Sequence, residues 1–225
     1  MNINYQILLK IMPYFKERFL SINRMVCELK LSRSIVMETL NPLIEEGFII
    51  ISGDTLNFRE DSIIMASTLA LKFGASLDEV CNVVGWQEFE NFVEKILIEY
   101  GYKTFKSFRL KRPRLEVDVL ALKRDFGLVV DCKQWRKSLS YSALNSIVMK
   151  QVERAKIILL KERVLLQNKF LIPIIVTLYP SPIKFVNGVP IVPVEMFKSF
   201  ASEVDGRLSE FLKVYLKGNV IFAKI

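Results

Sequence analysis

The chain has 225 residues, of which 51% are apolar and 25% charged. This apolar content is sufficient for one or two domains with a buried core, and it is too high for a disordered chain. Its 32 basic and 24 acidic side chains give a net charge of +8, which indicates an anionic partner such as nucleic acid or an anionic membrane surface. Histidine is absent, which excludes a Ser-His-Asp triad, a Cys-His pair, a zinc-histidine site and a histidine general base. Any catalysis would therefore depend on carboxylates, lysine, hydroxyl groups or a hard metal ion.

The charge is unevenly distributed along the chain. Residues 1–60 are neutral, residues 61–102 carry a net −5, and residues 103–225 carry a net +13. A surface that contacts phosphate is therefore expected in the last part, with any domain boundary before residue 103. Together with the element pattern, this predicts a domain over 1–60, a helical connector over 61–85 and a larger basic domain that follows it.

The first 60 residues show the pattern of three helices followed by a β-hairpin. Apolar residues three and four apart predict a helix over 4–18. Ser21 is placed to cap a second helix through Lys30, and Ser32 a third through Glu46. Two short apolar runs flank Gly53-Asp54, a dipeptide suited to a tight hairpin. This order resembles a winged helix-turn-helix domain.

Two functions are open for such a domain. The helix that begins after Ser32 would enter the major groove of DNA, with Arg33 as a groove contact. Glu38, Glu45 and Glu46 make the same helix acidic, whereas phosphate contacts favour lysine and arginine. A docking role toward a protein partner is therefore an equal alternative.

Residues 61–100 are predicted to be helical. Apolar spacing indicates one helix over 62–73, and the Ser76 to Glu79 capping box begins a short second one. A third helix covers 87–100, and Glu90 falls in its apolar row. That position puts the carboxylate at the edge of the buried stripe, and the alternative is a boundary glutamate that extends outward into water.

A basic stretch with aromatic interruptions follows the helix. It fits a strand and loop that contact phosphate, and the alternative is an edge strand protected by charge. The candidate nucleic-acid contacts, including two basic residues further along the chain, are Lys103, Lys106, Arg109, Lys111, Arg112, Arg114, Arg136 and Lys137.

Two apolar runs, 115–122 and 127–133, predict a β-hairpin around a four-residue loop, which places Asp118 directly opposite Asp131. Opposed strand residues have Cβ atoms about 4.5–5.5 Å apart, where like charges are destabilising. A hard divalent cation with oxygen ligands would neutralise the pair. The alternative is a structural salt bridge from Lys133 to one of the aspartates.

The arrangement of these residues resembles the PD-(D/E)XK nuclease superfamily, and in particular Mrr-like restriction endonucleases and archaeal Holliday-junction resolvases. A helix with Glu90 precedes Asp118, and a D-x-K triplet at 131–133 and a helix with Gln151 follow it. The resemblance covers about residues 86–176. It implies an α/β protein in which an N-terminal winged helix is joined to a C-terminal restriction-endonuclease-like mixed sheet flanked by helices, over residues 86–225.

The resemblance also implies roles for individual residues. Asp118 and Asp131 would hold Mg²⁺, for which Mn²⁺ would substitute, together with the backbone carbonyl of Cys132. Glu90 would add a carboxylate to the ion, directly or through water. Lys133 would position the attacking water and stabilise the phosphate. Such an ion polarises a phosphoryl oxygen and activates water without any histidine.

Three further residues near this set differ in what the resemblance implies for them. Gln151 would orient water or phosphate. Glu116 shares a strand face with Asp118 but matches no position of the motif, so its role is open. Val117 stands where the motif has proline, a departure shared by many members of the superfamily.

The predicted function is that of a Mg²⁺-dependent endonuclease acting on DNA, in repair, recombination or restriction. The alternative is a non-catalytic DNA-binding or regulatory protein that uses the nuclease fold as a platform. Cutting both strands would favour a homodimer. The three cysteines form no C-x-x-C pair and no apolar run reaches the ~18–20 residues that span a bilayer, so we expect a cytoplasmic protein without a membrane partner.

Overall fold

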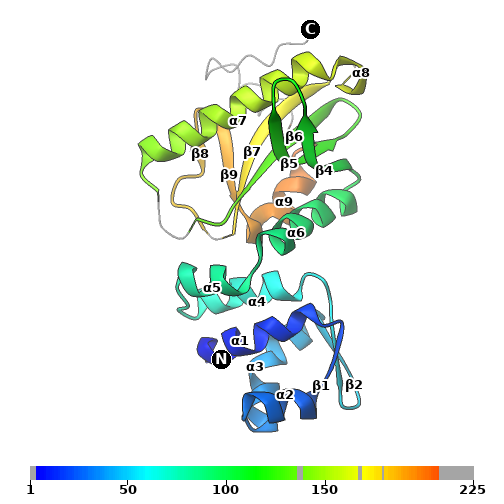
Figure 1. The fold of residues 1–225 in the computed structure, drawn as a ribbon, viewed down its shortest axis with the longest axis vertical. Helices are drawn as coiled ribbons and strands as arrows, with labels where there is room; N and C mark the ends of the chain where they lie inside the picture. The colour runs from blue at the N-terminus through cyan, green and yellow to red at the C-terminus, as the bar shows by residue number, and fades with distance from the viewer. Residues whose placement is uncertain (1–3, 136–138, 167–168, 179, 208–225) are drawn as a thin grey trace. The chain divides into compact units, whose positions relative to one another are not determined.

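The computed structural model describes residues 4–135, 139–166, 169–178 and 180–207 (Figure 1). The chain forms two compact units, Met1–Phe92 and Val93–Ile225. The division between them falls inside helix α6 (Trp86–Glu99).

The first unit combines helices with a small antiparallel sheet. The sheet has the strand order β1-β3-β2, and its β2–β3 hairpin turns at Gly53, whose φ of 64° suits glycine. The elements of this part are α1 (Tyr5–Ile11), the 3₁₀ helix η1 (Met12–Lys16), β1 (Phe19–Ser21), α2 (Ile22–Leu29), α3 (Arg33–Glu45), β2 (Ile49–Ser52) and β3 (Thr55–Phe58).

The predicted helix starts and the hairpin are confirmed, with two differences. The Ser21 and Ser32 hydroxyls accept hydrogen bonds from Arg24 N and Ile35 N, as helix caps do. The expected single helix over 4–18 ends as an α-helix at Ile11, because Pro13 has no N–H to continue the ladder, and the chain continues as η1. Strand β1 was not predicted.

The segment 61–85 is helical, as predicted. It contains α4 (Ser62–Lys72) and α5 (Leu77–Val83), and the Ser76–Glu79 capping box is formed. Helix α4 packs against α1, η1 and α3. The segment expected as a connector therefore contributes to the core of the first unit.

The second unit is a six-stranded mixed sheet flanked by helices. Its strand order is β4-β5-β6-β7-β9-β8, in which β6, β7 and β9 run parallel and the other neighbours antiparallel. Figure 1 shows α7 lying across the strands and α9 beside β9. The elements are β4 (Lys103–Leu110), β5 (Leu115–Leu122), β6 (Phe126–Lys133), α7 (Tyr141–Lys161), α8 (Arg163–Leu166), β7 (Phe170–Thr177), β8 (Phe185–Val186), β9 (Val189–Pro193) and α9 (Val194–Glu203).

The central hairpin has the predicted register. Strands β5 and β6 pair from Leu122↔Gly127 to Val119↔Val130, and the same register continued by one residue brings Asp118 to Asp131. Strand β6 is buried along its length apart from Lys133, because helices cover the sheet where its parallel strands lie. A buried strand that ends in Asp131 and Lys133 thus brings charged groups into an apolar sheet.

Candidate active site

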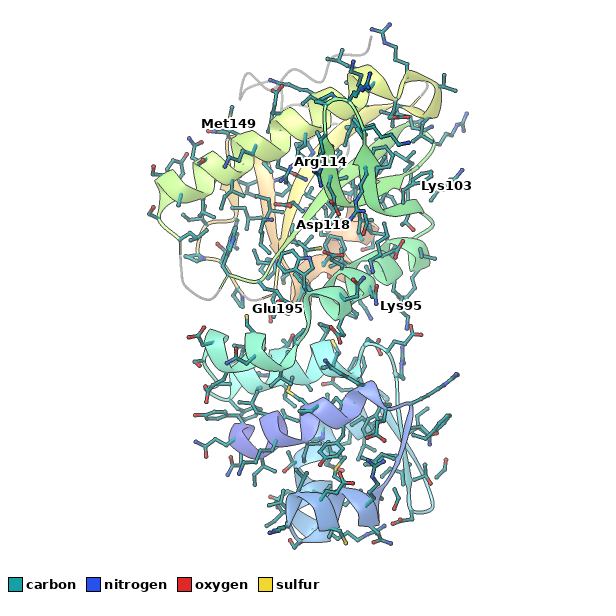
Figure 2. The ribbon with its side chains drawn as sticks, in the orientation of Figure 1. Lys95, Lys103, Arg114, Asp118, Met149 and Glu195 are labelled. Atoms are coloured by element: carbon teal, nitrogen blue, oxygen red, sulfur yellow. The ribbon has the colours of Figure 1, made fainter. Side chains whose placement is uncertain are left out.

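The site lies where strands β5 and β6 stop pairing with each other. The β5–β6 pairing ends at Val119↔Val130, although β5 extends back to Leu115 beside β4 and β6 extends forward beside β7. In this part of β5, labelled by Asp118 in Figure 2, the Asp118 Oδ2 atom accepts a 2.6 Å hydrogen bond from the backbone N–H of Cys132. The Asp118 carboxylate therefore bridges the two strands at the point where their own ladder ends.

Asp131 is a buried carboxylate held between two cations. Its side chain is only 4% exposed. The Oδ2 atom lies 2.8 Å from Nζ of Lys133, and Oδ1 lies 3.1 Å from Nη1 of Arg154. The contact with Arg154 is a hydrogen bond, whereas the contact with Lys133 is a short ion pair without hydrogen-bond alignment, so Oδ2 is a buried oxygen that accepts no hydrogen bond. Burial of a carboxylate is tolerated because opposite charges surround it.

Gln151 and Arg154 extend this arrangement onto helix α7. The buried Gln151 side chain donates from Nε2 to the Val129 carbonyl at 2.8 Å, and its Oε1 accepts from Arg154 Nη1 at 3.2 Å. The Gln151 amide is thus bonded within the protein, and its predicted role toward water or phosphate stays a prediction. Arg154 was missed from the sequence. The available signal was its spacing of three residues from Gln151, which puts both on one face of a helix.

Glu90 lies on α6 in the first compact unit, whereas the other predicted site residues lie in the second. Its side chain is buried, with 6% of the residue exposed, so the alternative of a glutamate that extends into water is wrong. Its contribution to a metal ion stays a prediction.

The donor atoms of the site suit a hard divalent cation. Asp118 and Asp131 supply carboxylate oxygens, and Mg²⁺ is usually held by one or two carboxylates together with waters and substrate phosphates. The buried Oδ2 of Asp131 is such an oxygen. Among the described residues no three His, Cys, Asp or Glu side chains gather into a metal-binding group. Remaining ligands would therefore come from carbonyl oxygens, water or DNA phosphate.

The predicted basic stretch forms strand β4 and the turn after it, and Figure 2 labels Lys103 and Arg114 at its two ends. Strand β4 is an edge of the sheet, which fits both the phosphate-contact prediction and its alternative of an edge protected by charge. Lys111 and Arg112 in the turn are exposed. The predicted contacts Arg136 and Lys137 lie outside the described residues.

Glu116, whose role the sequence left open, pairs with one of these basic residues. Its Oε1 atom accepts a 2.9 Å hydrogen bond from Nη2 of Arg109 across the β4–β5 ladder. This bond lowers the pKa of the Glu116 carboxyl. Arg109 is therefore partly neutralised within the chain.

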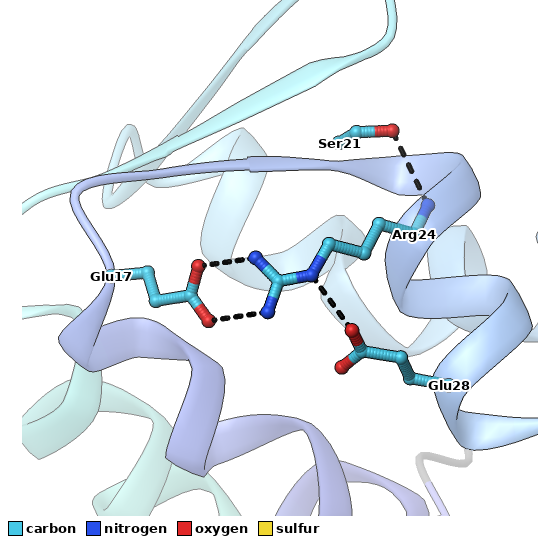
Figure 3. A network of polar contacts seen from close by, with 4 residues as sticks. All are labelled: Glu17, Ser21, Arg24 and Glu28. Atoms are coloured by element: carbon cyan, nitrogen blue, oxygen red, sulfur yellow. Dashed lines mark hydrogen bonds and ion pairs between the residues drawn. The ribbon is translucent and has the colours of Figure 1, made fainter.

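Two exposed arginines of the first unit, Arg24 and Arg33, are also paired with carboxylates. Figure 3 shows Arg24 between Glu17 and Glu28, with its guanidinium 2.8 Å and 2.7 Å from their oxygens. Arg33, the predicted groove contact, lies 2.6 Å from Oδ1 of Asp54 in the hairpin turn. These pairs reduce the positive charge that the unit offers to DNA phosphate.

The Asp54 pairing predicts a pH dependence of stability. The Ser21 hydroxyl and then the Arg33 guanidinium lower the pKa of the Asp54 carboxyl. A carboxyl whose pKa is lower in the folded state stabilises the fold above its unfolded pKa of about 3.9, and this contribution disappears as the pH falls through the folded pKa. The melting temperature of Asp54→Asn should therefore lie below that of the wild type at pH 7, with a gap that closes below about pH 3.9. A gap that stays constant down to acid pH would contradict this assignment.

The sheet and the position of the charged residues on it are those of a nuclease-type fold. The central hairpin of the mixed sheet carries an aspartate on one strand and a D-x-K triplet at the end of the next. Residues 82–161 match the family model described as a restriction endonuclease, Mrr_cat. This part of the chain is therefore similar to restriction endonuclease domains of the PD-(D/E)XK type, as the sequence resemblance implied. Such domains act on DNA and generally use divalent metals.

Two solved structures are similar to the chain at low identity. The restriction endonuclease FokI is 14% identical with a TM-score of 0.39, and the match covers 90% of this chain and 43% of FokI. Protein VC1899 from Vibrio cholerae is 14% identical with a TM-score of 0.29, and the match covers 93% of this chain and 55% of that protein. The chain thus spans about half the length of both. A comparison with curated proteins gives no match.

Among the described helices, none combines the length and the apolar character needed to cross a membrane.

Proposed function

We propose that the chain is a divalent-metal-dependent DNA endonuclease that hydrolyses phosphodiester bonds. The observation that carries the proposal is the hydrogen bond from the Cys132 N–H to Asp118, which brings Asp118 to the residue between the paired Asp131 and Lys133, at the point where β5 and β6 stop pairing. Two carboxylates and an ammonium group in this part of a nuclease-type sheet are the groups needed to hold a hard cation and a phosphate.

In this proposal, Asp118, Asp131 and the Cys132 carbonyl hold the ion, and the carboxylate expected from Glu90 stays a prediction from the sequence. Mg²⁺, or Mn²⁺ in its place, would supply polarisation of the phosphoryl oxygen and a lower pKa for bound water. Lys133 ends the same strand as Asp131 with its side chain 23% exposed, so its ammonium group can reach a phosphate while it stays beside the carboxylate. There it would position the attacking water and stabilise the added negative charge of the phosphate.

The DNA would be bound by the basic side chains of β4 and the turn after it. Lys103, Lys111, Arg112 and Arg114 are exposed, and each phosphate contact makes binding more sensitive to salt. Arg109 should contribute less, because Glu116 already neutralises it. A homodimer would allow both strands to be cut.

The first unit is proposed to be a winged helix that contacts a protein partner. Its helices α1, α2 and α3 and the β2–β3 hairpin occur in the expected order. The exposed side of α3 carries Glu38 and Glu45, and Arg33 is engaged by Asp54. These observations favour a protein partner over DNA, because a helix in the major groove needs free positive charge near phosphate.

A second candidate function is DNA binding without cleavage. It is favoured by the two cations that already neutralise Asp131 within the chain, since such a pair can be purely structural. In that case the nuclease-type fold would be a binding platform, as the sequence alternative proposed.

The test is a panel of labelled DNAs (duplex, single strand, flap and four-way junction) incubated with the full chain and Mg²⁺ or Mn²⁺. We expect cleavage of at least one DNA, with loss of cleavage in EDTA and in Asp131→Ala. Binding that is independent of metal and unaffected by Asp131→Ala, without any cleavage, would instead support the second candidate.

An Arg33→Ala variant in the same panel tests the groove contact, since weaker duplex binding would show that α3 contacts DNA.

A further inference from the structure

The buried Asp131 carboxylate is held by a closed chain of hydrogen bonds that begins and ends on strand β6. The Val129 carbonyl accepts from Gln151, the Gln151 oxygen accepts from Arg154, and Arg154 donates to Oδ1 of Asp131. The two acceptors on β6, the Val129 carbonyl and the Asp131 carboxylate, belong to residues two positions apart. Helix α7 is thereby joined to β6 at both positions.

The two cations at Asp131 make different contacts. Arg154 forms an aligned hydrogen bond to Oδ1, whereas Lys133 lies close to Oδ2 without such alignment. A planar guanidinium held by a second acceptor fixes the direction of its N–H groups, whereas an ammonium group on a flexible stem does not. Gln151 supplies that second acceptor and is itself fully buried. The position of Oδ1 is therefore fixed, whereas Oδ2, which Lys133 approaches without a hydrogen bond, is the oxygen that could contact a further cation.

We propose that Arg154 is a positioning residue: by holding Oδ1 of Asp131, it directs Oδ2 toward the site of the divalent cation. This inference rests on the proposed metal-dependent function. It assigns Arg154 a different role from Lys133, which lies on the Oδ2 side and is proposed to contact the phosphate. Hydrogen bonds from neighbouring groups to ligating carboxylates orient them in this way in metal sites generally.

Whether removal of Arg154 weakens or tightens metal binding distinguishes a positioning role of Arg154 from a purely electrostatic one. If Arg154 acted only as a positive charge, its removal would tighten cation binding, because a repelling charge 3.1 Å from the carboxylate would be lost. If Arg154 positions Asp131, its removal weakens cation binding, since the carboxylate can rotate away. Loss of such a supporting contact typically costs about 10- to 100-fold in metal affinity.

The experiment measures Mn²⁺ binding to the full chain without DNA, by the loss of the free-ion EPR signal. Arg154→Ala should weaken Mn²⁺ binding about 10- to 100-fold, and Arg154→Lys, which keeps a donor, should recover part of the loss. Lys156→Ala removes a neighbouring cation of α7 and should leave the affinity within about twofold. Melting curves of all variants check the fold, and Arg154→Lys keeps the test valid if Arg154→Ala does not fold.

The outcomes separate this inference from the proposed function. Mn²⁺ binding in Arg154→Ala that equals or exceeds that of the wild type would overturn the role of Arg154 and leave the nuclease proposal intact. Weaker binding in Arg154→Ala, with no cleavage of any DNA by the wild type, would support the role of Arg154 and contradict the nuclease proposal. A wild type that binds no Mn²⁺, either alone or with duplex DNA present, would overturn both.

Discussion

Replacement of Lys133 by alanine is expected to lower the rate of Mg²⁺-dependent DNA cleavage by about 100- to 1000-fold. The ammonium group lies at the end of β6, 2.8 Å from Asp131, where it can stabilise the negative charge that develops on the phosphate. Losing one donor to the charge that develops in the transition state typically reduces turnover by that factor. The measurement is single-turnover cleavage of the best DNA of the panel at saturating Mg²⁺.

A matched control separates this effect from a general loss of positive charge. Lys184→Ala removes an exposed lysine of the same unit and should leave the rate within about twofold. Arg154 still pairs with Asp131 in Lys133→Ala, so the variant should fold, which its melting curve can verify. An unchanged cleavage rate in folded Lys133→Ala would rule out the proposed role.

Replacement of Gln151 by leucine is expected to lower the free energy of unfolding by about 2–4 kcal/mol. Leucine fills much of the same space but leaves the buried Val129 carbonyl without its hydrogen bond and removes an acceptor from Arg154. A buried polar group left unsatisfied costs about 1–3 kcal/mol, and a hydrogen bond to a charged group contributes about 1.5–3 kcal/mol. Urea unfolding followed by circular dichroism measures the change.

The exposed neighbour Lys150 provides the comparison for Gln151. Lys150→Leu introduces the same side chain one position earlier on α7 and should change the free energy of unfolding by no more than about 0.5 kcal/mol. If Gln151→Leu were as stable as the wild type but lost cleavage, the predicted contact of Gln151 with water or phosphate would be preferred over its structural role.

The β5–β6 hairpin of the site could be predicted from the sequence because neighbouring residues in the chain determine it. Two buried runs and a four-residue loop leave one register that keeps the apolar side chains together, and the observed pairing of β5 with β6 agrees. Helix starts were also local, since Ser21, Ser32 and Ser76 cap their helices through residues three positions away.

Features that depend on distant segments were not predictable in the same way. Strand β1 has three residues and pairs with β3, more than 30 residues further along the chain. Arg154 reaches Asp131, 23 residues earlier in the chain, only because α7 packs on the sheet. The pattern identified the aspartates and Lys133, but not the partner that holds Asp131 in place.

The hydrogen bond between Asp118 and the Cys132 N–H has a consequence for which sequences can build this site. The bond uses the main chain of residue 132, so the N–H that Asp118 accepts from is present whichever side chain stands there, unless that residue is proline. Proline at the middle of the D-x-K triplet lacks the N–H and would therefore detach the Asp118 carboxylate from β6.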